Sequence, residues 1–304
     1  MRNIDIDSLE IFKAVVDCGG ITKAAARLNR VQSNITTRVK NLEERLQVSL
    51  FHREGGKLVL TAEGHLLLTY AERLLRLSTE AEAALRSRSP SGRLRIGTLE
   101  STAAARLPPL LSSYHERYPE VQLELVTGDT TSMIERVRSF DVEAAFVSDP
   151  FLADDLEARP AFTEELMLIG SKDITSLAEA RQLAQRTVIA FATGCSYRRI
   201  LEDWLSMSKI IPERILELTS YHAITACVAA GSGIGIMPRS VLRAVHAVGQ
   251  VQALPLPPKF AQTCTHLIWR PGYSSVALEA LQEELSRCDY DERASHPFDR
   301  ELEL

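Results

Sequence analysis

The sequence predicts an α/β protein with an all-α winged helix–turn–helix head, and three observations support that fold class. Residues 1–60 have the pattern of short helices followed by a hairpin, and one long helical pattern comes next. From residue 93 onward, strand-like and helix-like segments alternate. The chain has 304 residues, enough for two domains at roughly 100–200 residues each. We therefore expect a head over 1–61, a linker helix and hinge over 62–90, and an α/β domain over 91–304.

The head begins with a predicted helix in which Leu9 and Phe12 recur at helical spacing, and the glycine pair at 19–20 ends it. Thr22 is a suitable N-cap for a second helix. A third helix follows after a short turn, because apolar residues recur there on one face. These residues are Ile35, Val39, Leu42 and Leu46. Residues 50–60 are typical of a hairpin, since a glycine pair separates two apolar runs.

The exposed face of the third helix is rich in groups that pair with DNA. Asn and Gln can pair with adenine, Arg can pair with guanine, and hydroxyls can contact phosphates or bases. A face that is only solvated would carry good helix formers, whereas Ser, Thr and Asn are poor ones. A helix–turn–helix places such a face in the major groove of double-stranded DNA. We expect DNA contacts from Thr22, Lys23, Gln32, Ser33, Asn34, Thr36, Thr37, Arg38, Lys40 and, near the wing, Arg53.

The distribution of charge points to the same partner. The whole chain carries a net charge of −5, yet residues 1–60 hold ten Lys/Arg against seven Asp/Glu. Residues 93–304 hold 21 basic and 29 acidic groups. A basic head on an acidic body predicts an anionic partner for the head alone.

The long helix that starts at residue 62 carries apolar residues in a 3–4 alternation, which is typical of paired helices. We expect it to join copies of the chain, with Leu67, Leu74 and Ala81 in the seam. The alternative is a long amphipathic helix packed on its own chain. Residues 87–92 have the composition of a linker.

The alternation beyond the linker predicts parallel sheets covered by helices. Strands are expected at 94–98, 121–127, 142–147, 166–169, 188–191, 215–218, 233–237 and 266–269. Helices are expected at 102–117, 132–139, 174–185, 197–207, 222–230, 238–245 and 275–287. The last sixteen residues are mostly charged and polar and are expected to form a loose tail.

Composition excludes several classes of protein. The chain is 45% hydrophobic and 25% charged, which is ordinary for a folded globular protein. Its five cysteines contain no Cys-x-x-Cys pair, which argues against a disulfide framework or a zinc knuckle and favours a reducing compartment. The N-terminus lacks the apolar core of a signal peptide, and no apolar run is long enough to span a membrane. We expect a cytoplasmic protein with no membrane partner.

Several short motifs of the head occur together and in a characteristic order. They are Leu9, Phe12, Ala24-Ala25, Leu28, Leu42-Glu43-Glu44, Leu50-Phe51-His52-Arg53 and Leu60-Thr61-Ala62-Glu63-Gly64. This set resembles the DNA-binding region of LysR-type transcriptional regulators. Many members carry Gln-Pro-Ala where this chain has Gln32-Ser33-Asn34, so the bases that relatives contact do not carry over.

The resemblance implies a sequence-specific DNA-binding regulator that forms a homodimer or homotetramer. It also implies an effector domain with two lobes, similar to periplasmic binding proteins. Lobe I would comprise residues 93–165 and 266–288, and lobe II would comprise residues 166–265. The runs at 99–102, 195–199 and 220–222 further resemble the branch that holds an enterobacterial putrescine-utilisation regulator.

In such a domain the ligand lies between the lobes, where strands end and helices begin. Hydroxyl-rich segments occupy such places in this chain, and helix capping is the alternative role for them. The resemblance implies an amino acid, an amine or a small carboxylate as effector, and Glu100 favours a zwitterion or an amine. Effector contacts are expected from Glu100, Ser101, Thr102, Thr127, Thr130, Cys195, Ser196 and His222.

Two other functions are considered. Cys195 precedes a helix and is followed by Arg198 and Arg199, a setting that lowers a thiol pKa and would suit a redox-sensing regulator. An enzyme or ligand carrier fused to a DNA-binding head would need a catalytic constellation. We find no Gly-x-Ser-x-Gly, P-loop or His ligand spacing, so no catalytic residue, metal or cofactor is predicted.

Overall fold

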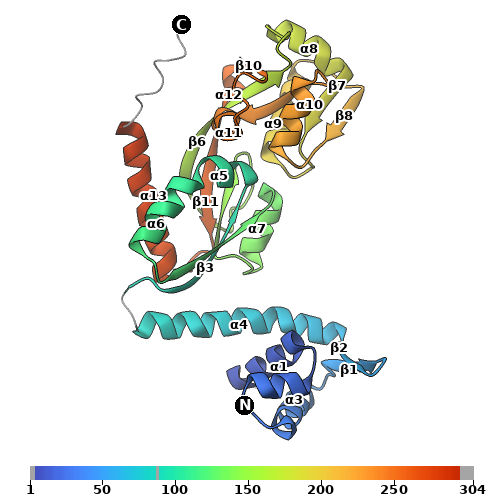
Figure 1. Ribbon diagram of the computed structural model, residues 1–304, viewed down its shortest axis with the longest axis vertical. Helices are drawn as coiled ribbons and strands as arrows, with labels where there is room; N and C mark the ends of the chain where they lie inside the picture. The colour runs from blue at the N-terminus through green and yellow to red at the C-terminus, as the bar shows by residue number, and fades with distance from the viewer. Residues whose placement is uncertain (1–3, 87–88, 295–304) are drawn as a thin grey trace. The chain divides into compact units, whose positions relative to one another are not determined.

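The computed structural model describes residues 4–86 and 89–294 and divides into two compact units, residues 1–88 and 89–304. Figure 1 labels their helices and strands in chain order. Each unit has its own hydrophobic core. Part of the expected hinge, residues 87–88, lies outside the described residues, as does the end of the chain from residue 295.

The first unit is a winged helix–turn–helix, as predicted. Its elements are α1 (Ile6–Cys18), α2 (Ile21–Arg27), α3 (Gln32–Leu46), β1 (Phe51–Glu54), β2 (Lys57–Leu60) and α4 (Ala62–Arg86). The Asp5 side chain caps α1 by accepting a hydrogen bond from the Ser8 N–H at 2.8 Å. Gly19 ends α1 in the left-handed conformation, with φ at 67°. The strands β1 and β2 pair antiparallel and form the wing.

The helix α4 packs one of its faces on its own head. Leu67 and Ala71 are buried in a cluster that includes Leu9 and Phe12 of α1. Gly64 permits the close approach, because a Cβ atom there would lie 2.2 Å from the Leu50 carbonyl oxygen. Leu67 therefore cannot lie in a seam between two chains, which corrects the expected seam.

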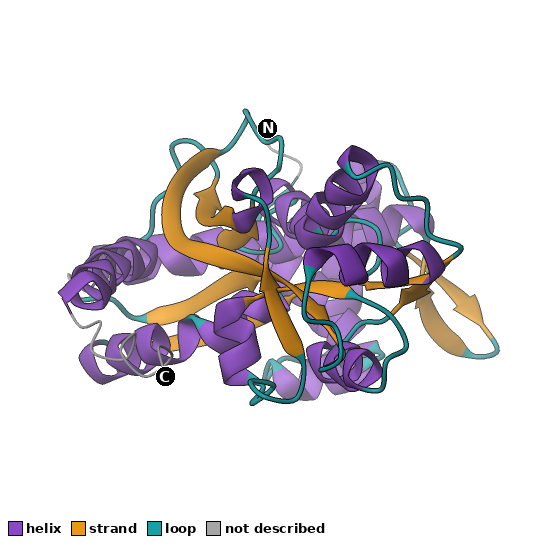
Figure 2. Ribbon diagram, turned by 90° about the horizontal axis from the view of Figure 1, so that it is seen from above, coloured by secondary structure: helices purple, strands orange, loops and turns teal. Residues whose placement is uncertain are grey.

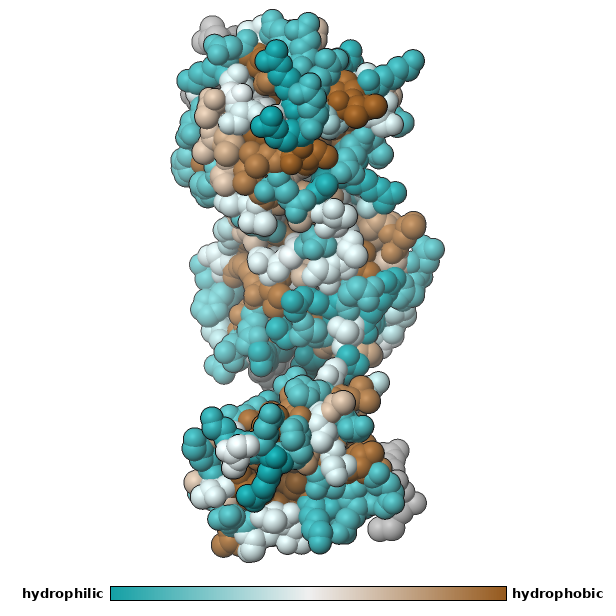
Figure 3. Space-filling view, turned by 90° about the vertical axis from the view of Figure 1, so that its right-hand side faces the viewer, coloured by the Kyte–Doolittle hydropathy of each residue, from teal (hydrophilic) through white to brown (hydrophobic). Residues whose placement is uncertain are grey.

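The neighbouring face of α4 is apolar and exposed. Its exposed large apolar side chains are Leu66, Tyr70, Leu74 and Leu77. On the face of the molecule in Figure 3, apolar patches interrupt a mostly hydrophilic surface. The internal packing of one face agrees with the alternative reading, and the pairing of α4 between copies of the chain stays a prediction that concerns the exposed face.

Lobe I of the second unit has a sheet in which β3 lies parallel between β4 and β5. Its elements are β3 (Gly92–Thr98), α5 (Glu100–Ala105), α6 (Leu107–Arg117), β4 (Val121–Thr127), α7 (Thr130–Arg138), β5 (Ala144–Ser148) and α13 (Val276–Ala294). Leu94, Ile96 and Phe146 of the sheet pack against residues of α6 and α13. Helices and strands are distinguished by colour in Figure 2.

Two long strands connect lobe I to lobe II. The first half of β6 (Glu157–Gly170) pairs antiparallel with β11 (Gln262–Trp269), which also pairs antiparallel with β5. The second half of β6 pairs antiparallel with β9 and β10 of lobe II. The remaining elements of lobe II are α8 (Leu177–Arg186), β7 (Thr187–Ala190), α9 (Ser196–Met207), β8 (Arg214–Glu217), α10 (Tyr221–Ala229), β9 (Gly235–Pro238), α11 (Arg239–Ala244), β10 (Gln252–Pro255) and α12 (Pro258–Ala261).

The structure corrects four predictions about this unit. The main sheet is mixed, because β6 and β11 run antiparallel to their neighbours. The helix expected at 102–117 is divided into α5 and α6, since Pro108 and Pro109 cannot donate the hydrogen bonds that would continue α5. The short strand β10 was not predicted. Residues 289–294 of the expected loose tail continue α13.

No helix in residues 4–86 and 89–294 is long and apolar enough to cross a membrane.

Candidate functional site

The DNA-facing candidates of the head are all exposed. On α3, Ile35, Val39 and Leu42 are buried against the rest of the head. The predicted contact residues of α3 are exposed, and so are Thr22 and Lys23 at the start of α2 and Arg53 on β1. At 100° per residue, Ser33 and Thr37 project almost opposite the buried face.

Three of the candidates on α3 have partners within the head, and one of them is Lys40, whose ammonium lies 3.6 Å from the carboxylate of Glu44. The Thr36 hydroxyl donates to the Gln32 carbonyl oxygen at 3.0 Å, so it can only accept a further hydrogen bond. The Arg38 guanidinium lies 3.5 Å from the carboxylate of Asp7, on the side of α3 that faces α1. The Arg30 guanidinium donates to the same carboxylate and, as the largest cause, lowers the pKa of Asp7. The outward positions of the recognition helix therefore belong to Ser33 and Thr37 more than to Arg38.

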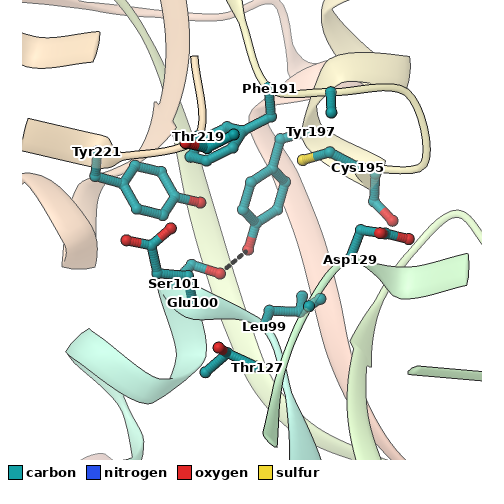
Figure 4. Close-up of a pocket in the computed structure, with 13 residues that line it drawn as sticks. Leu99, Glu100, Ser101, Thr127, Asp129, Phe191, Cys195, Tyr197, Thr219 and Tyr221 are labelled. Carbon is teal, nitrogen blue, oxygen red and sulfur yellow. Dashed lines mark hydrogen bonds between the residues drawn. The ribbon is translucent and has the colours of Figure 1, made fainter. Parts of the chain in front are cut away.

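The second candidate site is a cavity of about 300 Å³ between the two lobes. Figure 4 shows its lining side chains. Lobe I contributes Leu99, Glu100, Ser101, Thr127, Gly128 and Asp129. Lobe II contributes Phe191, Ala192, Cys195, Ser196, Tyr197, Thr219 and Tyr221. The cavity thus lies where β3, β4 and β7 end and where α5, α7, α9 and α10 begin.

The structure brings some of the predicted effector residues together and separates others. Those that line this cavity are Glu100, Ser101, Thr127, Cys195 and Ser196. Thr102 is only 2% exposed and lines no described cavity, so it is not the surface residue that we expected. Thr130 lines a neighbouring cavity of about 450 Å³ that shares Cys195 and Ser196. His222 is exposed and does not line the cavity, although its charge acts on Glu100.

Several lining residues were not predicted. Asp129 lies in the same hydroxyl-rich loop as two predicted residues, and Tyr197 and Tyr221 are direct neighbours of Ser196 and His222. Their positions next to predicted residues in the sequence were the only indication that these three residues line the cavity. Aromatic residues at helix starts are commonly core residues, however, and both tyrosines are at least 96% buried.

A closed circuit of hydrogen bonds joins the lobes next to the cavity. The Ser196 hydroxyl donates to the Ser148 carbonyl oxygen at 2.7 Å, so Thr130 must be the donor in its 2.9 Å hydrogen bond with Ser196. The Ser148 N–H in turn points at the Thr130 hydroxyl oxygen at 3.4 Å. All three residues are at least 95% buried. Ser196 is the lobe II member of this circuit, and it makes both of the crossing hydrogen bonds.

Two further close approaches join lobe I and lobe II, and a third set of contacts holds the connecting strand β6. The hydroxyls of Ser101 and Tyr197 lie 3.4 Å apart. A Cβ atom on Gly194, whose φ is 105°, would lie 2.8 Å from a carboxylate oxygen of Asp129. The buried Glu164 carboxylate of β6 accepts from Arg106 of lobe I at 2.6 Å and from Ser240 of lobe II at 2.6 Å.

Burial changes the acidity of two cavity residues. It raises the pKa of Glu100 above its ordinary value, and the charge of His222 opposes that shift. Burial also raises the pKa of the Cys195 thiol, more than the nearby N–H groups of α9 lower it. The expected lowering of the Cys195 pKa is therefore not found, and a neutral thiol is a poor redox sensor.

No group of three or more His, Cys, Asp or Glu side chains in the described part of the chain is arranged to hold a metal ion.

Two protein families match most of the chain. Residues 6–65 match the bacterial regulatory helix–turn–helix family of lysR type, and residues 87–288 match the LysR substrate binding domain. The HTH-type transcriptional regulator YusT of Bacillus subtilis, itself uncharacterised, is 38% identical over 280 residues, which cover 91% of this chain and 94% of YusT.

Two solved structures are similar over almost the whole chain. Full-length OxyR from Pseudomonas aeruginosa is 20% identical with a TM-score of 0.68, and the match covers 94% of this chain and 95% of OxyR. Full-length CbnR in complex with its target DNA is 22% identical with a TM-score of 0.66, and the match covers 93% of this chain and 99% of CbnR. At these identities the two structures establish the fold.

Proposed function

The chain belongs to the LysR family of transcriptional regulators, and from that premise we propose that a small molecule bound between its lobes controls how it acts on DNA. The observation that carries this proposal is the interlobe cavity, whose walls come from both lobes. A ligand that contacts both lobes favours one arrangement of them over others. Its binding energy can therefore change the conformation that the head presents to DNA.

For the head, we infer that α3 reads the operator in the major groove. Support comes from the exposed hydroxyl and amide side chains opposite its buried face. Lys23 on α2 and Arg53 on β1 are exposed cations of the same head and suit phosphate contacts. CbnR, which has the same fold, has been solved with its target DNA. Such a regulator acts in the cytoplasm, where bacterial chromosomal DNA lies.

For assembly, we infer a homodimer or homotetramer that forms through the exposed face of α4. Leu66, Tyr70 and Leu77 lie on that face within three turns of helix, and each is more than half exposed. A row of exposed apolar side chains on a long helix is typical of a helix-pairing surface.

For the ligand, the family resemblance supports an amino acid, an amine or a small carboxylate. The resemblance to the branch of the putrescine-utilisation regulator favours an amine among these. A cavity of about 300 Å³ lies at the lower end of the range for small-molecule sites, about 300–1,000 Å³, and suits a ligand of this size.

The experiment uses a variant that fills the cavity from its rim. Thr219 is exposed on the loop before α10 and lines the cavity, so Thr219→Trp blocks it without disturbing a core. The operator is first selected from genomic fragments with the full-length protein, and a reporter gene is then placed under its control. Thr219→Trp should bind the operator as the wild type does but should no longer respond to metabolites that alter wild-type output.

A matched control places a tryptophan side chain on the surface outside the cavity. Val248 is 63% exposed and lines none of the described cavities, so Val248→Trp should leave both operator binding and the response intact. A Thr219→Trp variant that responds at wild-type metabolite concentrations would show that control does not pass through this cavity.

A further inference from the structure

Resting on the proposed effector role of the interlobe cavity, we propose that its ligand is a small organic cation without a carboxylate, such as a primary or methylated amine. The cation would lie between carboxylates of lobe I and aromatic rings of lobe II. Of the amino acid, the amine and the small carboxylate, only the amine has this chemistry.

The first observation is the sign of the charge in the cavity wall. Glu100 and Asp129 line the cavity, and none of its lining residues is Lys or Arg. The Glu100 carboxylate makes no hydrogen bond or ion pair with any described residue, whereas Asp129 already accepts from the Ser132 N–H at 2.9 Å. A carboxylate ligand would be repelled by two acids and would find no guanidinium or ammonium partner. A cation in the cavity would give Glu100 a direct ionic partner, whereas the charge of His222 acts on it from outside the cavity lining.

The second observation is the aromatic content of the opposite wall. Phe191, Tyr197 and Tyr221 line it, and the Phe191 and Tyr221 rings meet edge-on with centroids 4.6 Å apart. In Figure 4 the Glu100 carboxylate lies beside the Tyr221 ring, and the Tyr221 hydroxyl points toward Tyr197. Aromatic rings attract a cation within about 6 Å of their faces. Burial raises the pKa of both tyrosines, so both stay neutral and keep this attraction.

The third observation is how these groups divide between the lobes. Glu100 begins α5 and Asp129 caps α7, both in lobe I, whereas Phe191 follows β7 and the two tyrosines begin α9 and α10 in lobe II. A cation between them gains energy from both walls only when the lobes are close together. The ligand would therefore strengthen the contact between the lobes that the hydrogen bonds of Ser196 already make. We expect the two lobes to close when it binds.

The experiment uses three probes of similar shape and different charge: hexylamine, hexanoate and 1-hexanol. Each is titrated into the full-length protein by isothermal titration calorimetry at neutral pH and fixed ionic strength. Hexylamine should bind about tenfold more tightly than hexanol, and hexanoate should bind more weakly than hexanol. Glu100→Gln should weaken hexylamine binding about tenfold and leave hexanol binding unchanged. Phe191→Leu should weaken hexylamine binding without reversing the preference for the cation.

Glu120→Gln is the matched control, because Glu120 is exposed, lies in the same unit and lines none of the described cavities. It should bind all three probes as the wild type does. Circular dichroism of each variant establishes that it is folded.

The outcomes separate this inference from the proposed function. Hexanoate binding that is tighter than hexylamine binding and is lost in Thr219→Trp would overturn the cation class and leave the effector cavity standing. Hexylamine binding that Thr219→Trp does not change would place the amine elsewhere and overturn the cation class, while the reporter response of Thr219→Trp decides the proposed function separately. Hexylamine that binds no better than hexanol, or equally well to Glu100→Gln, also overturns the cation class.

Discussion

Ser196 is the residue through which lobe II is most directly hydrogen-bonded to lobe I. Its hydroxyl donates to the Ser148 carbonyl oxygen and accepts from Thr130. In Ser196→Ala, the carbonyl and the Thr130 hydroxyl would both stay buried without that partner. The variant should lose about 1–3 kcal/mol of unfolding free energy. Urea unfolding followed by tryptophan fluorescence measures this, since Trp204 is fully buried on the same helix.

The control for that variant is Ser132→Ala in lobe I. The Ser132 hydroxyl makes no hydrogen bond in the described part of the chain, and the residue is only partly buried. Its unfolding midpoint should match that of the wild type. Equal midpoints for Ser196→Ala and the wild type would mean that the circuit contributes nothing to stability.

Glu100 should make the binding of a cation depend on pH. Burial raises its pKa above the ordinary 4.5, so the carboxylate becomes protonated at a higher pH than an exposed glutamate does. The other titratable groups in the cavity wall are Asp129 before α7, Cys195 before α9, Tyr197 on α9 and Tyr221 on α10, and the charge of His222 on α10 also acts on Glu100. Cation affinity is then complete above the raised pKa and falls as the pH drops through it.

Hexylamine titrations at a series of pH values, from neutral down toward the ordinary glutamate range, test this dependence. The wild-type affinity should begin to fall above pH 4.5, and Glu100→Gln should flatten that part of the profile. A slope that remains in Glu100→Gln would come from groups other than Glu100. Equal slopes in both proteins would assign the whole effect to groups other than Glu100.

Arg38 and Thr37 should play different parts in operator binding. Arg38 is turned toward Asp7, which suits a phosphate contact at the edge of the groove, whereas Thr37 projects opposite the buried face. Arg38→Ala should weaken binding to all sequences alike and lower the salt slope by about one. Thr37→Ala should change the preference among operator variants at one position. Footprinting titrations on a set of single-base operator variants, at two salt concentrations, separate the two effects.

The apolar residues of the helix α4 form two sets, one buried against the head and one exposed. Leu67 and Ala71 pack against the head. The exposed set is Leu66, Tyr70 and Leu77. Leu77→Glu places a charge on the exposed face and should shift the oligomer toward monomer, because a paired helix would bury that charge. Sedimentation velocity over a range of protein concentrations measures the shift. Thr79→Glu, an exposed change on another side of the same helix, should keep the wild-type oligomer.

The strand β6 joins the two lobes, because it pairs with strands of both. Its first half belongs to the sheet of lobe I, and its second half pairs with β9 and β10 in lobe II. Glu164 lies near the change of partners, where Arg106 and Ser240 hold its buried carboxylate from the two sides. If the lobes change their arrangement, this short segment is where the change of angle is expected, and hydrogen bonds hold its centre in place.

At the scale of the whole molecule, each compact unit has its own buried core. Differential scanning calorimetry of the full-length protein should therefore show two unfolding transitions. Ser196→Ala should lower the midpoint of one transition and leave the other in place. A single transition that shifts as a whole would show that the two units unfold together.

Features that depend on near neighbours along the chain could be predicted from the amino-acid sequence. The helices of the head, the wing and the family follow from apolar spacing, glycine positions and short motifs, because residues three or four apart meet on one face of a helix. The ends of β3 and β4 were predicted from short apolar runs that polar segments follow, and with them the positions of Ser101 and Thr127.

Contacts between residues from distant parts of the chain could not be predicted and became visible in the folded protein. The antiparallel pairing of β6 and β11, the buried face of α4 and the aromatic wall beside Glu100 all depend on contacts between residues far apart in sequence. Apolar spacing identifies the buried faces of a helix or strand but does not say which partner covers each of them. Tyr197 and Tyr221 therefore looked like ordinary core residues until the two lobes placed them opposite Glu100.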